Sequence, residues 1–262
     1  MKDFVVGWLR SRALQSIWSR LHRLSLIAMN FWSSNLCVSG EIKTVAHVAR
    51  KLEDTPNPVI FDVGANVGEF SAICLDAFSG DCIVHAFEPS PRTYALLQAH
   101  FSNRPGAAPR LHNFGFSDSV RDGKLYSSEA GSTIASVYDL ENPLRPFRAE
   151  FTEIVSLSTV DRFCGEQGID RIDFLKLDIE GHEYAVLLGA SAMLEQGRIR
   201  FLQFEFGENN VASRTYLADF HRLLADRYDM YRIVPKGLVP WRYDGGASEI
   251  FATMNYFCEL KG

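Results

Sequence analysis

Short apolar runs alternate with helical patterns from residue 58 onward. Apolar runs of this length, bounded by polar and turn-forming residues, predict buried β-strands. The predicted strands span residues 59–63, 82–87, 111–116, 172–177, 199–206, 228–234 and 253–258. Helices are predicted up to residue 75, over 91–101 with Ser90 as the N-cap, from about residue 182, and over 216–224. This alternation predicts an α/β fold, with a mostly parallel sheet and helices on both faces.

Two stretches lie outside this alternation. Residues 1–45 have helical patterns of their own and are expected to form an N-terminal helical extension to an α/β domain over 46–262. Residues 119–157 contain short alternating stretches, so we expect a β-hairpin or an insertion that faces the substrate. Ligands of a parallel sheet bind beyond the carboxyl ends of its strands. The residues after each predicted strand are therefore the first candidates for a functional site.

The first 40 residues are both apolar and basic. Five basic residues stand against one acid, Asp3, which gives a local net charge of +4; they are Lys2, Arg10, Arg12, Arg20 and Arg23. The charge-free run Leu24–Gly40 is too short and polar for a transmembrane helix, and recurring arginines fit a signal peptide poorly. We expect helices that pack on the core or on a second subunit. The alternatives are an amphipathic helix on an anionic membrane surface and a lid over the substrate.

Composition narrows the class of partner and the compartment. The net charge of −5 argues against nucleic acid as the main partner, because a polyanion normally requires a basic surface. Five cysteines without a C-x-x-C pair indicate neither a disulfide framework nor a zinc site. A cytoplasmic protein is therefore expected, with attachment to the membrane periphery through the N-terminal helices as the alternative.

The first predicted strand runs into a glycine-containing turn, Asp62-Val63-Gly64-Ala65-Asn66-Val67-Gly68. Gly64 allows a tight turn and close approach of the backbone to a ligand, and Gly68 allows close packing of the next helix. The N–H groups at the start of that helix can hold an anion or an acidic group. The motif predicts a ligand site, although turns with two glycines are also common for structural reasons alone.

An acidic residue ends the second predicted strand, in Ala86-Phe87-Glu88-Pro89. Glu88 lies 26 residues after Asp62, where a carboxylate can accept hydrogen bonds from both hydroxyls of a ribose. A nicotinamide site usually has G-x-G-x-x-G around a pyrophosphate, whereas this chain has Gly64-x-x-x-Gly68. Asp62, if it faces the ligand, would repel a pyrophosphate and could orient water or an ammonium group. The pattern favours S-adenosylmethionine, which has no phosphate.

A block of charged residues ends the strand predicted at 172–177, in Asp-Phe-Leu-Lys-Leu-Asp-Ile-Glu-Gly-His-Glu from 173 to 183. Lys176, Asp178 and Glu180 alternate, so we expect them to point to one side of the strand. Three charged groups on one face are costly to bury unless they are paired or used. One interpretation is a structural ion-pair network. The functional interpretation places Asp178 near the donor or the acceptor hydroxyl, with His182 at the start of the next helix.

Together these motifs closely resemble the FkbM-type methyltransferases. The resemblance covers about residues 56–210, and its most specific part is 176–183. It implies a Rossmann-like class I methyltransferase core, S-adenosylmethionine as the donor, and O-methylation of a sugar, a glycan or a secondary metabolite. The first 40 residues and the insertion at 119–150 lie outside it and are expected to shape the pocket for a small-molecule or glycan acceptor.

The resemblance also implies roles for particular residues. By this likeness the donor site contains Asp62, Gly64, Ala65, Asn66 and Gly68, with Glu88 and Pro89 at the ribose and Ser117 and Asp118 near the adenine. Asp178, Glu180 and His182 would lie on the acceptor side, and Glu205 matches a recurrent acidic position.

A general base assists attack by an alcohol oxygen. His182 is the first candidate because imidazole titrates near neutral pH, and Asp178 and Glu180 follow. No metal is expected. The alternative is Mg²⁺ with Asp178, Glu180 and Glu205 as oxygen ligands, but alternation along one strand does not by itself give octahedral geometry.

Two other functions stay open at the level of the sequence. One is an NAD-dependent oxidoreductase, against which the missing G-x-G-x-x-G weighs. The other is an inactive adenosyl-binding scaffold that assembles through its N-terminal helices. A homo-oligomer is compatible with all of these functions.

Overall fold

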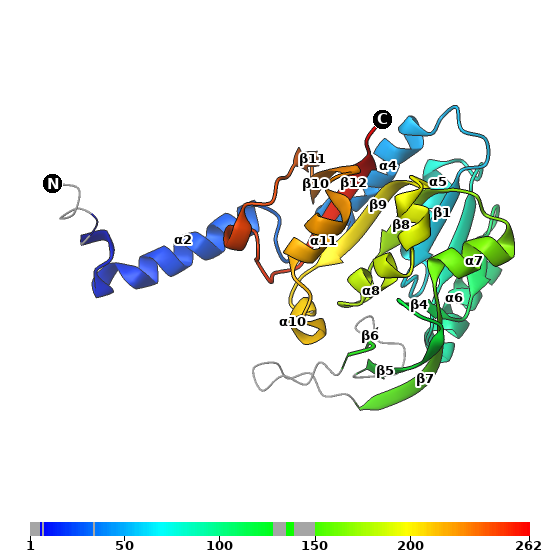
Figure 1. Cartoon of the computed structure of the whole chain (residues 1–262), viewed down its shortest axis with the longest axis horizontal. Helices are drawn as coiled ribbons and strands as arrows, with labels where there is room; N and C mark the ends of the chain where they lie inside the picture. Colours follow the sequence, from blue (N-terminus) through cyan, green and yellow to red (C-terminus); the bar gives the residue numbers. More distant parts are fainter. Residues whose placement is uncertain (1–5, 7, 34, 128–134, 139–149) are drawn as a thin grey trace.

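The computed structural model describes residues 6, 8–33, 35–127, 135–138 and 150–262. These residues form a large eight-stranded sheet in the order β11-β10-β12-β9-β8-β1-β2-β3 (Figure 1). The strands are β1 Val59–Val63, β2 Ile83–Phe87, β3 Arg110–His112, β8 Ile172–Leu177, β9 Ile199–Phe206, β10 Tyr228–Val234, β11 Gly237–Pro240 and β12 Met254–Leu260. From β3 to β9 neighbouring strands are parallel, whereas β12 is antiparallel to both β9 and β10.

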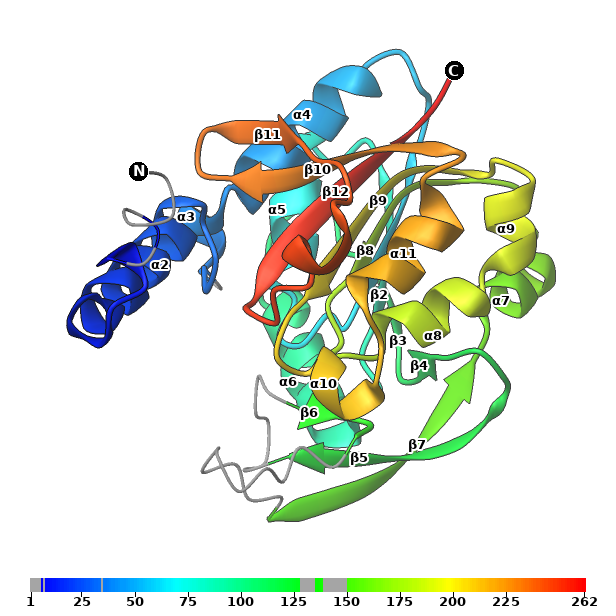
Figure 2. The same cartoon turned by 60° about the vertical axis from the view of Figure 1, so that its left-hand side comes forward.

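Helices cover both faces of this sheet (Figure 2). One face packs against α4 (Glu41–Lys51), α5 (Glu69–Ala77) and α6 (Pro91–Ser102). The other packs against α7 (Val160–Gln167), α8 (Glu183–Leu188), α9 (Ser191–Glu195) and α11 (Leu217–Leu224). The predicted α/β fold, with a mostly parallel sheet and helices on both faces, is therefore confirmed.

The strands read as continuous apolar runs because both of their faces are buried. In β1, Ile60 joins the apolar cluster on one face, whereas Phe61 and Val63 join the cluster on the other. The predicted strands at 59–63, 172–177, 199–206 and 228–234 have the observed bounds. The predicted N-cap is also confirmed, since Ser90 Oγ accepts a hydrogen bond from the Thr93 N–H at 3.3 Å.

The single strand predicted over residues 111–116 is wrong. The chain leaves the large sheet after His112, and Gly115–Phe116 forms β4 of a second, small sheet. Asn113 turns the chain between the two sheets, because its Nδ2 donates to the carbonyl oxygens of Glu88 and Pro89 at 2.9 and 3.2 Å.

The small sheet has the order β4-β7-β5-β6. Its other strands are β5 (Arg121–Ser127), β6 (Ala135–Ser136) and β7 (Phe151–Ser158), with β5 and β7 antiparallel. Much of the insertion predicted at 119–157 therefore forms β-structure, as expected for hairpin material. Its residues 128–134 and 139–149 lie outside the described residues.

The N-terminal segment projects away from both sheets as α2 (Gln15–Ala28; Figure 1). The C-terminal end of α2 and the residues after it are fixed to the domain, because Leu26 and Phe31 are buried and the Trp32 N–H donates to the Thr253 carbonyl oxygen at 2.8 Å. The predicted packing on the core holds only for this end; the other large apolar side chains of α2 are exposed. Residues 1–5, with Lys2 and Asp3, lie outside the described part. None of the described helices is long and apolar enough to cross a bilayer.

Candidate active site

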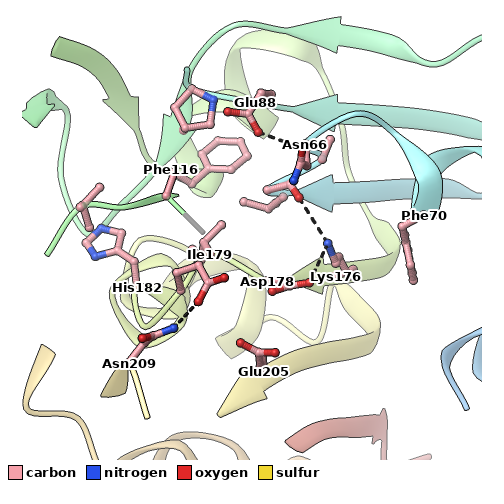
Figure 3. A pocket seen from close by; sticks show the side chains of 18 of the residues that line it. Asn66, Phe70, Glu88, Phe116, Lys176, Asp178, Ile179, His182, Glu205 and Asn209 are labelled. Atoms are coloured by element: carbon pink, nitrogen blue, oxygen red, sulfur yellow. Dashed lines mark hydrogen bonds and ion pairs between the residues drawn. The ribbon is translucent and has the colours of Figure 1, made fainter. Parts of the chain in front are cut away.

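A cavity of about 540 Å³ lies at the carboxyl ends of the parallel strands (Figure 3). Its volume is within the range of small-molecule sites, roughly 300–1,000 Å³. The loops after β1, β2, β8 and β9 each contribute to its wall, and the small sheet contributes apolar side chains from Phe116, Leu125 and Leu157. The cavity therefore lies where the strand pattern places a ligand site.

The loop after β1 brings backbone atoms to the edge of the cavity. Gly64 has a φ of +79°, and a Cβ atom there would lie 2.1 Å from the Asp178 carbonyl oxygen, so this position requires glycine. The N–H groups of Gly64 and Ala65 donate to the Phe87 carbonyl oxygen at 3.1 and 2.9 Å. Asn66 also lines the cavity, and its buried Oδ1 has no hydrogen-bond partner among the described residues.

Gly68 allows the loop after β1 to pack closely against α6. Its φ is +92°, and a Cβ atom would lie 2.5 and 2.6 Å from the side chains of Phe101 and Leu97 on α6. Gly68 is not among the described residues that line the cavity.

Glu88 follows β2 and lies beside Asn66 in the cavity (Figure 3), which Pro89 also lines. Its two carboxylate oxygens accept hydrogen bonds from the N–H groups of Asn66 and Ser90, at 3.0 and 2.9 Å. Each oxygen has a second lone pair for a further donor. Burial raises the pKa of Glu88 to about 7, with the two backbone hydrogen bonds opposing the rise.

Asp62 does not face the cavity, contrary to the sequence-based expectation. Its side chain points toward α5, where Ser71 Oγ donates to Asp62 Oδ2 at 2.7 Å. Lys176 Nζ lies between two carboxylates, 3.2 Å from Asp62 Oδ1 and 3.4 Å from Asp178 Oδ2. Burial disfavours the ammonium ion, but Asp62 and Asp178 more than offset this effect and raise the pKa of Lys176. The strand pair β1–β8 thus contains a buried ion-pair network at the base of the cavity.

Lys176, Asp178 and Glu180 all line the cavity, as expected of groups that point to one side, but only Lys176 lies on β8 itself. Strand β8 ends at Leu177, and Glu180 lies in the following turn with a φ of +56°. The carboxylate of Glu183 holds this turn, because its Oε1 accepts from the Ile179 and Gly181 N–H groups at 2.9 and 3.2 Å. Sequence reasoning missed Glu183, for which an acid in the first turn of a predicted helix was the available signal.

His182 is the N-cap of α8, so the helix starts one residue later than predicted. It lines the cavity while only 4% of it is exposed. Its Nδ1 lies 3.0 Å from the Tyr138 hydroxyl, and its Nε2 lies 3.0 Å from Ser117 Oγ. Burial, assisted by Arg121, lowers the pKa of His182 to about 4. The imidazole is therefore neutral at physiological pH.

Ser117 and Asp118 lie behind His182, outside the described lining of the cavity. Ser117 Oγ donates to Asp118 Oδ1 and accepts from an Arg121 guanidinium N–H, each at 3.0 Å. A hydroxyl has a single proton, so Ser117 Oγ must accept from His182 Nε2–H. The lone pair of His182 is then on Nδ1, which faces Tyr138. These contacts hold one tautomer of the histidine.

A further acidic residue, Glu205, lies near the carboxyl end of β9. Glu205 is partly buried, and its pKa is raised by burial and by the nearby carboxylates of Asp178 and Glu180. Asn209 Nδ2 donates to Glu180 Oε2. Within the described ranges, no group of three or more His, Cys, Asp or Glu residues is placed to hold a metal ion, and this includes the alternative Mg²⁺ set.

Asn209 and Glu41 in the cavity were also missed from the sequence. Asn209 follows a predicted strand, and the rule of strand ends could have found it. Glu41 begins α4 and is buried beside the cavity, where its Oε1 accepts from Gln203 Nε2 at 2.7 Å. No motif marked Glu41.

The chain matches the family described as the methyltransferase FkbM domain over residues 62–230. It is 26% identical over 171 residues to the 2-O-methyltransferase NoeI of Sinorhizobium fredii, which covers 61% of this chain and 68% of that protein. It is 28% identical over 168 residues to the hexuronic acid methyltransferase AglP of Haloferax volcanii, covering 64% of each. The 31-O-demethyl-FK506 methyltransferase FkbM of Streptomyces tacrolimicus is 32% identical over 53% of this chain and 61% of its own length. The matched family range includes the cavity loops after β1, β2, β8 and β9.

Proposed function

Because this chain belongs to the FkbM family of methyltransferases, as its motifs predicted, we propose that it transfers the methyl group of S-adenosylmethionine to a hydroxyl of a sugar, a glycan or a secondary metabolite. Three relatives support the acceptor class by their names: a 2-O-methyltransferase, a hexuronic acid methyltransferase and a methyltransferase of 31-O-demethyl-FK506.

The charge of the cavity is the observation that supports the donor. Its described lining has one lysine, already paired with aspartates, and six acidic side chains: Glu41, Glu69, Glu88, Asp178, Glu180 and Glu205. Burial raises the pKa of Glu41, Glu88 and Glu205, and a cationic ligand would favour their ionised forms. A pyrophosphate would be repelled in such a site, whereas the sulfonium and ammonium groups of S-adenosylmethionine would be attracted. The unpartnered Asn66 Oδ1 adds an acceptor for a donor group of the ligand. The residues present therefore fit S-adenosylmethionine better than a nicotinamide dinucleotide.

Glu88, His182 and Asp178 are the side chains to which we assign roles in methyl transfer. Bound S-adenosylmethionine supplies a methyl group made electrophilic by the positive sulfur. Glu88 accepts hydrogen bonds from the ribose hydroxyls. His182 is the first candidate to accept the acceptor's proton, at Nδ1, where the acceptor hydroxyl would take the place of the Tyr138 hydroxyl, and Asp178 is the second candidate for this role. The apolar side chains of the small sheet help to exclude water from the cavity.

Calorimetric titration with S-adenosylhomocysteine tests the donor site. We expect micromolar affinity, about −8 kcal/mol, for the wild-type chain. Glu88→Gln should weaken binding by about tenfold to a hundredfold, because a charge-assisted hydrogen bond contributes roughly 1.5–3 kcal/mol. Glu166→Gln is the matched control, since this exposed residue pairs with Arg162 on α7 away from the cavity.

The result for the folded wild-type chain decides between the candidate functions. Binding of NAD in place of S-adenosylhomocysteine would favour the oxidoreductase and overturn the proposal. Binding of S-adenosylhomocysteine without donor turnover on any acceptor of a hydroxyl panel would favour the adenosyl-binding scaffold.

A further inference from the structure

Helix α2 presents an unpartnered apolar stripe to the solvent. Ile17, Leu21, Leu24 and Ala28 recur every three or four residues, so they share one face of the helix. The side chains of Ile17, Leu21 and Leu24 are 47%, 48% and 60% exposed. Trp18 lies beside this stripe and is 40% exposed. A soluble helix that packed on its own domain would bury such a face.

The segment around the stripe is strongly basic. From Trp8 to Gly40 the sequence has no acidic residue and four arginines, Arg10, Arg12, Arg20 and Arg23. The first 40 residues carry +4 within a chain of net charge −5, so the remaining residues carry −9. The positive charge is therefore concentrated on the part that projects from the domain (Figure 1).

Two partners could cover the stripe, a second copy of α2 or an anionic lipid surface, and charge favours the lipid surface. A second copy of α2 would bring only further arginines and no acidic residue to pair with Arg20 and Arg23, and like charges oppose association. An anionic lipid surface attracts the arginines, and tryptophan side chains prefer the boundary between headgroups and acyl chains. Trp8, which precedes the helix, is 62% exposed and adds such a side chain.

We propose that α2 lies on the surface of an anionic phospholipid bilayer, with its apolar stripe in the headgroup–acyl boundary and its arginines at the headgroups. The segment that follows α2 leads directly to the cavity, since Leu36 and Glu41 line it. Docking would hold the cavity close to the lipid surface. In a consequence that rests on the proposed function, the acceptor class would then be a hydroxyl compound attached to a lipid.

Flotation of the full chain with lipid vesicles tests the docking and requires neither donor nor acceptor. We expect flotation with vesicles of phosphatidylcholine and phosphatidylglycerol, and little with phosphatidylcholine alone. Leu21→Ser/Leu24→Ser should abolish it. Arg20→Ser/Arg23→Ser should weaken it by about thirtyfold, because each arginine near an anionic surface contributes about fivefold. Val120→Ser/Val211→Ser is the matched control, since these valines are exposed elsewhere on the chain.

Several outcomes would overturn the proposal. The first is that the folded wild-type chain does not float with the anionic vesicles. The second is that either α2 variant floats as well as the wild-type chain. The third is that the control variant loses flotation as much as the α2 variants do. Light scattering without lipid tests whether a second copy of the chain covers the stripe. A dimer that Leu21→Ser/Leu24→Ser dissociates would identify the stripe as a subunit interface and overturn the proposal. Retained binding of S-adenosylhomocysteine by the α2 variants would separate failure of docking from failure of the proposed function.

Discussion

Glu183 is a fully buried carboxyl at the start of α8, and its environment disfavours ionisation. Burial raises its pKa from 4.5 to about 7, although the Ile179 and Gly181 N–H groups oppose the rise. In the described residues, its Oε2 has no hydrogen-bond partner. Because the folded state binds this proton more tightly than the unfolded state, the stability that Glu183 contributes is fully present below about pH 4.5 and is lost as the pH rises through about 7.

Glu183→Gln should therefore flatten the pH dependence of stability. The amide keeps an oxygen for the two N–H groups and removes the cost of ionisation, which is about 3 kcal/mol at most. Urea unfolding at about pH 5 and about pH 8 measures the change in the free energy of unfolding. The variant should gain most relative to wild type at the higher pH, whereas Glu166→Gln should not. An equal effect of Glu183→Gln at both pH values would contradict the linkage.

His182 combines a neutral imidazole with a fixed tautomer at the edge of the cavity. His182→Ala should lower kcat by about 10²–10⁴-fold, the usual contribution of a general base, and should leave the affinity for S-adenosylhomocysteine unchanged. His221→Ala on α11 is the control and should retain activity. The measurement uses the best acceptor from a panel of glycosides.

The lowered pKa of His182, about 4, adds a signature in the pH profile. The base is neutral above this value, so kcat should show no loss due to this group as the pH falls through about 6.5, where an ordinary imidazole gains its proton. A fall in kcat at that pH that disappears in His182→Ala would contradict the assignment.

At the scale of elements, two glycines differ in whether their position could accept a side chain. Gly64 must be glycine because a Cβ atom would overlap the Asp178 carbonyl oxygen, and Gly165 in α7 has open space around it. Gly64→Ala should abolish donor binding or folding. Gly165→Ala should raise the melting temperature, because alanine favours a helix over glycine by up to about 1 kcal/mol. Thermal unfolding of both variants tests the comparison, and destabilisation by Gly165→Ala would contradict it.

The main strands could be predicted because each buried strand is a continuous apolar run, and the cavity could be placed because ligands bind at strand ends. The small sheet was harder, since the two residues of β4 are too few for any periodic pattern. The orientation of Asp62 depends on α5, whose Ser71 bonds to it, and the local sequence does not show this contact. The turn at Glu180 was missed because a left-handed conformation is rare for glutamate.

Across the whole molecule, charge is divided between two regions. The cavity is rich in acidic side chains, whereas helix α2 has two arginines and no acidic residue. With the proposed donor and the proposed docking, this division would let one chain attract a cationic donor and an anionic surface without the two attractions competing. The two regions are joined by the short stretch from Asn30 to Glu41, which Asn30 fixes to the sheet by donating to the Ile233 carbonyl oxygen at 3.0 Å.

The position of β12 has a consequence for synthesis of the protein. This strand, the last of the large sheet, lies between β9 and β10 and pairs with both. While a ribosome makes residues 207–253, the edge of β9 has no partner strand, and the hairpin of β10 and β11 has no place in the sheet. An unpaired strand edge of this kind invites pairing with other chains. The large sheet can therefore close only after residues 254–260 are available, so it forms late in synthesis.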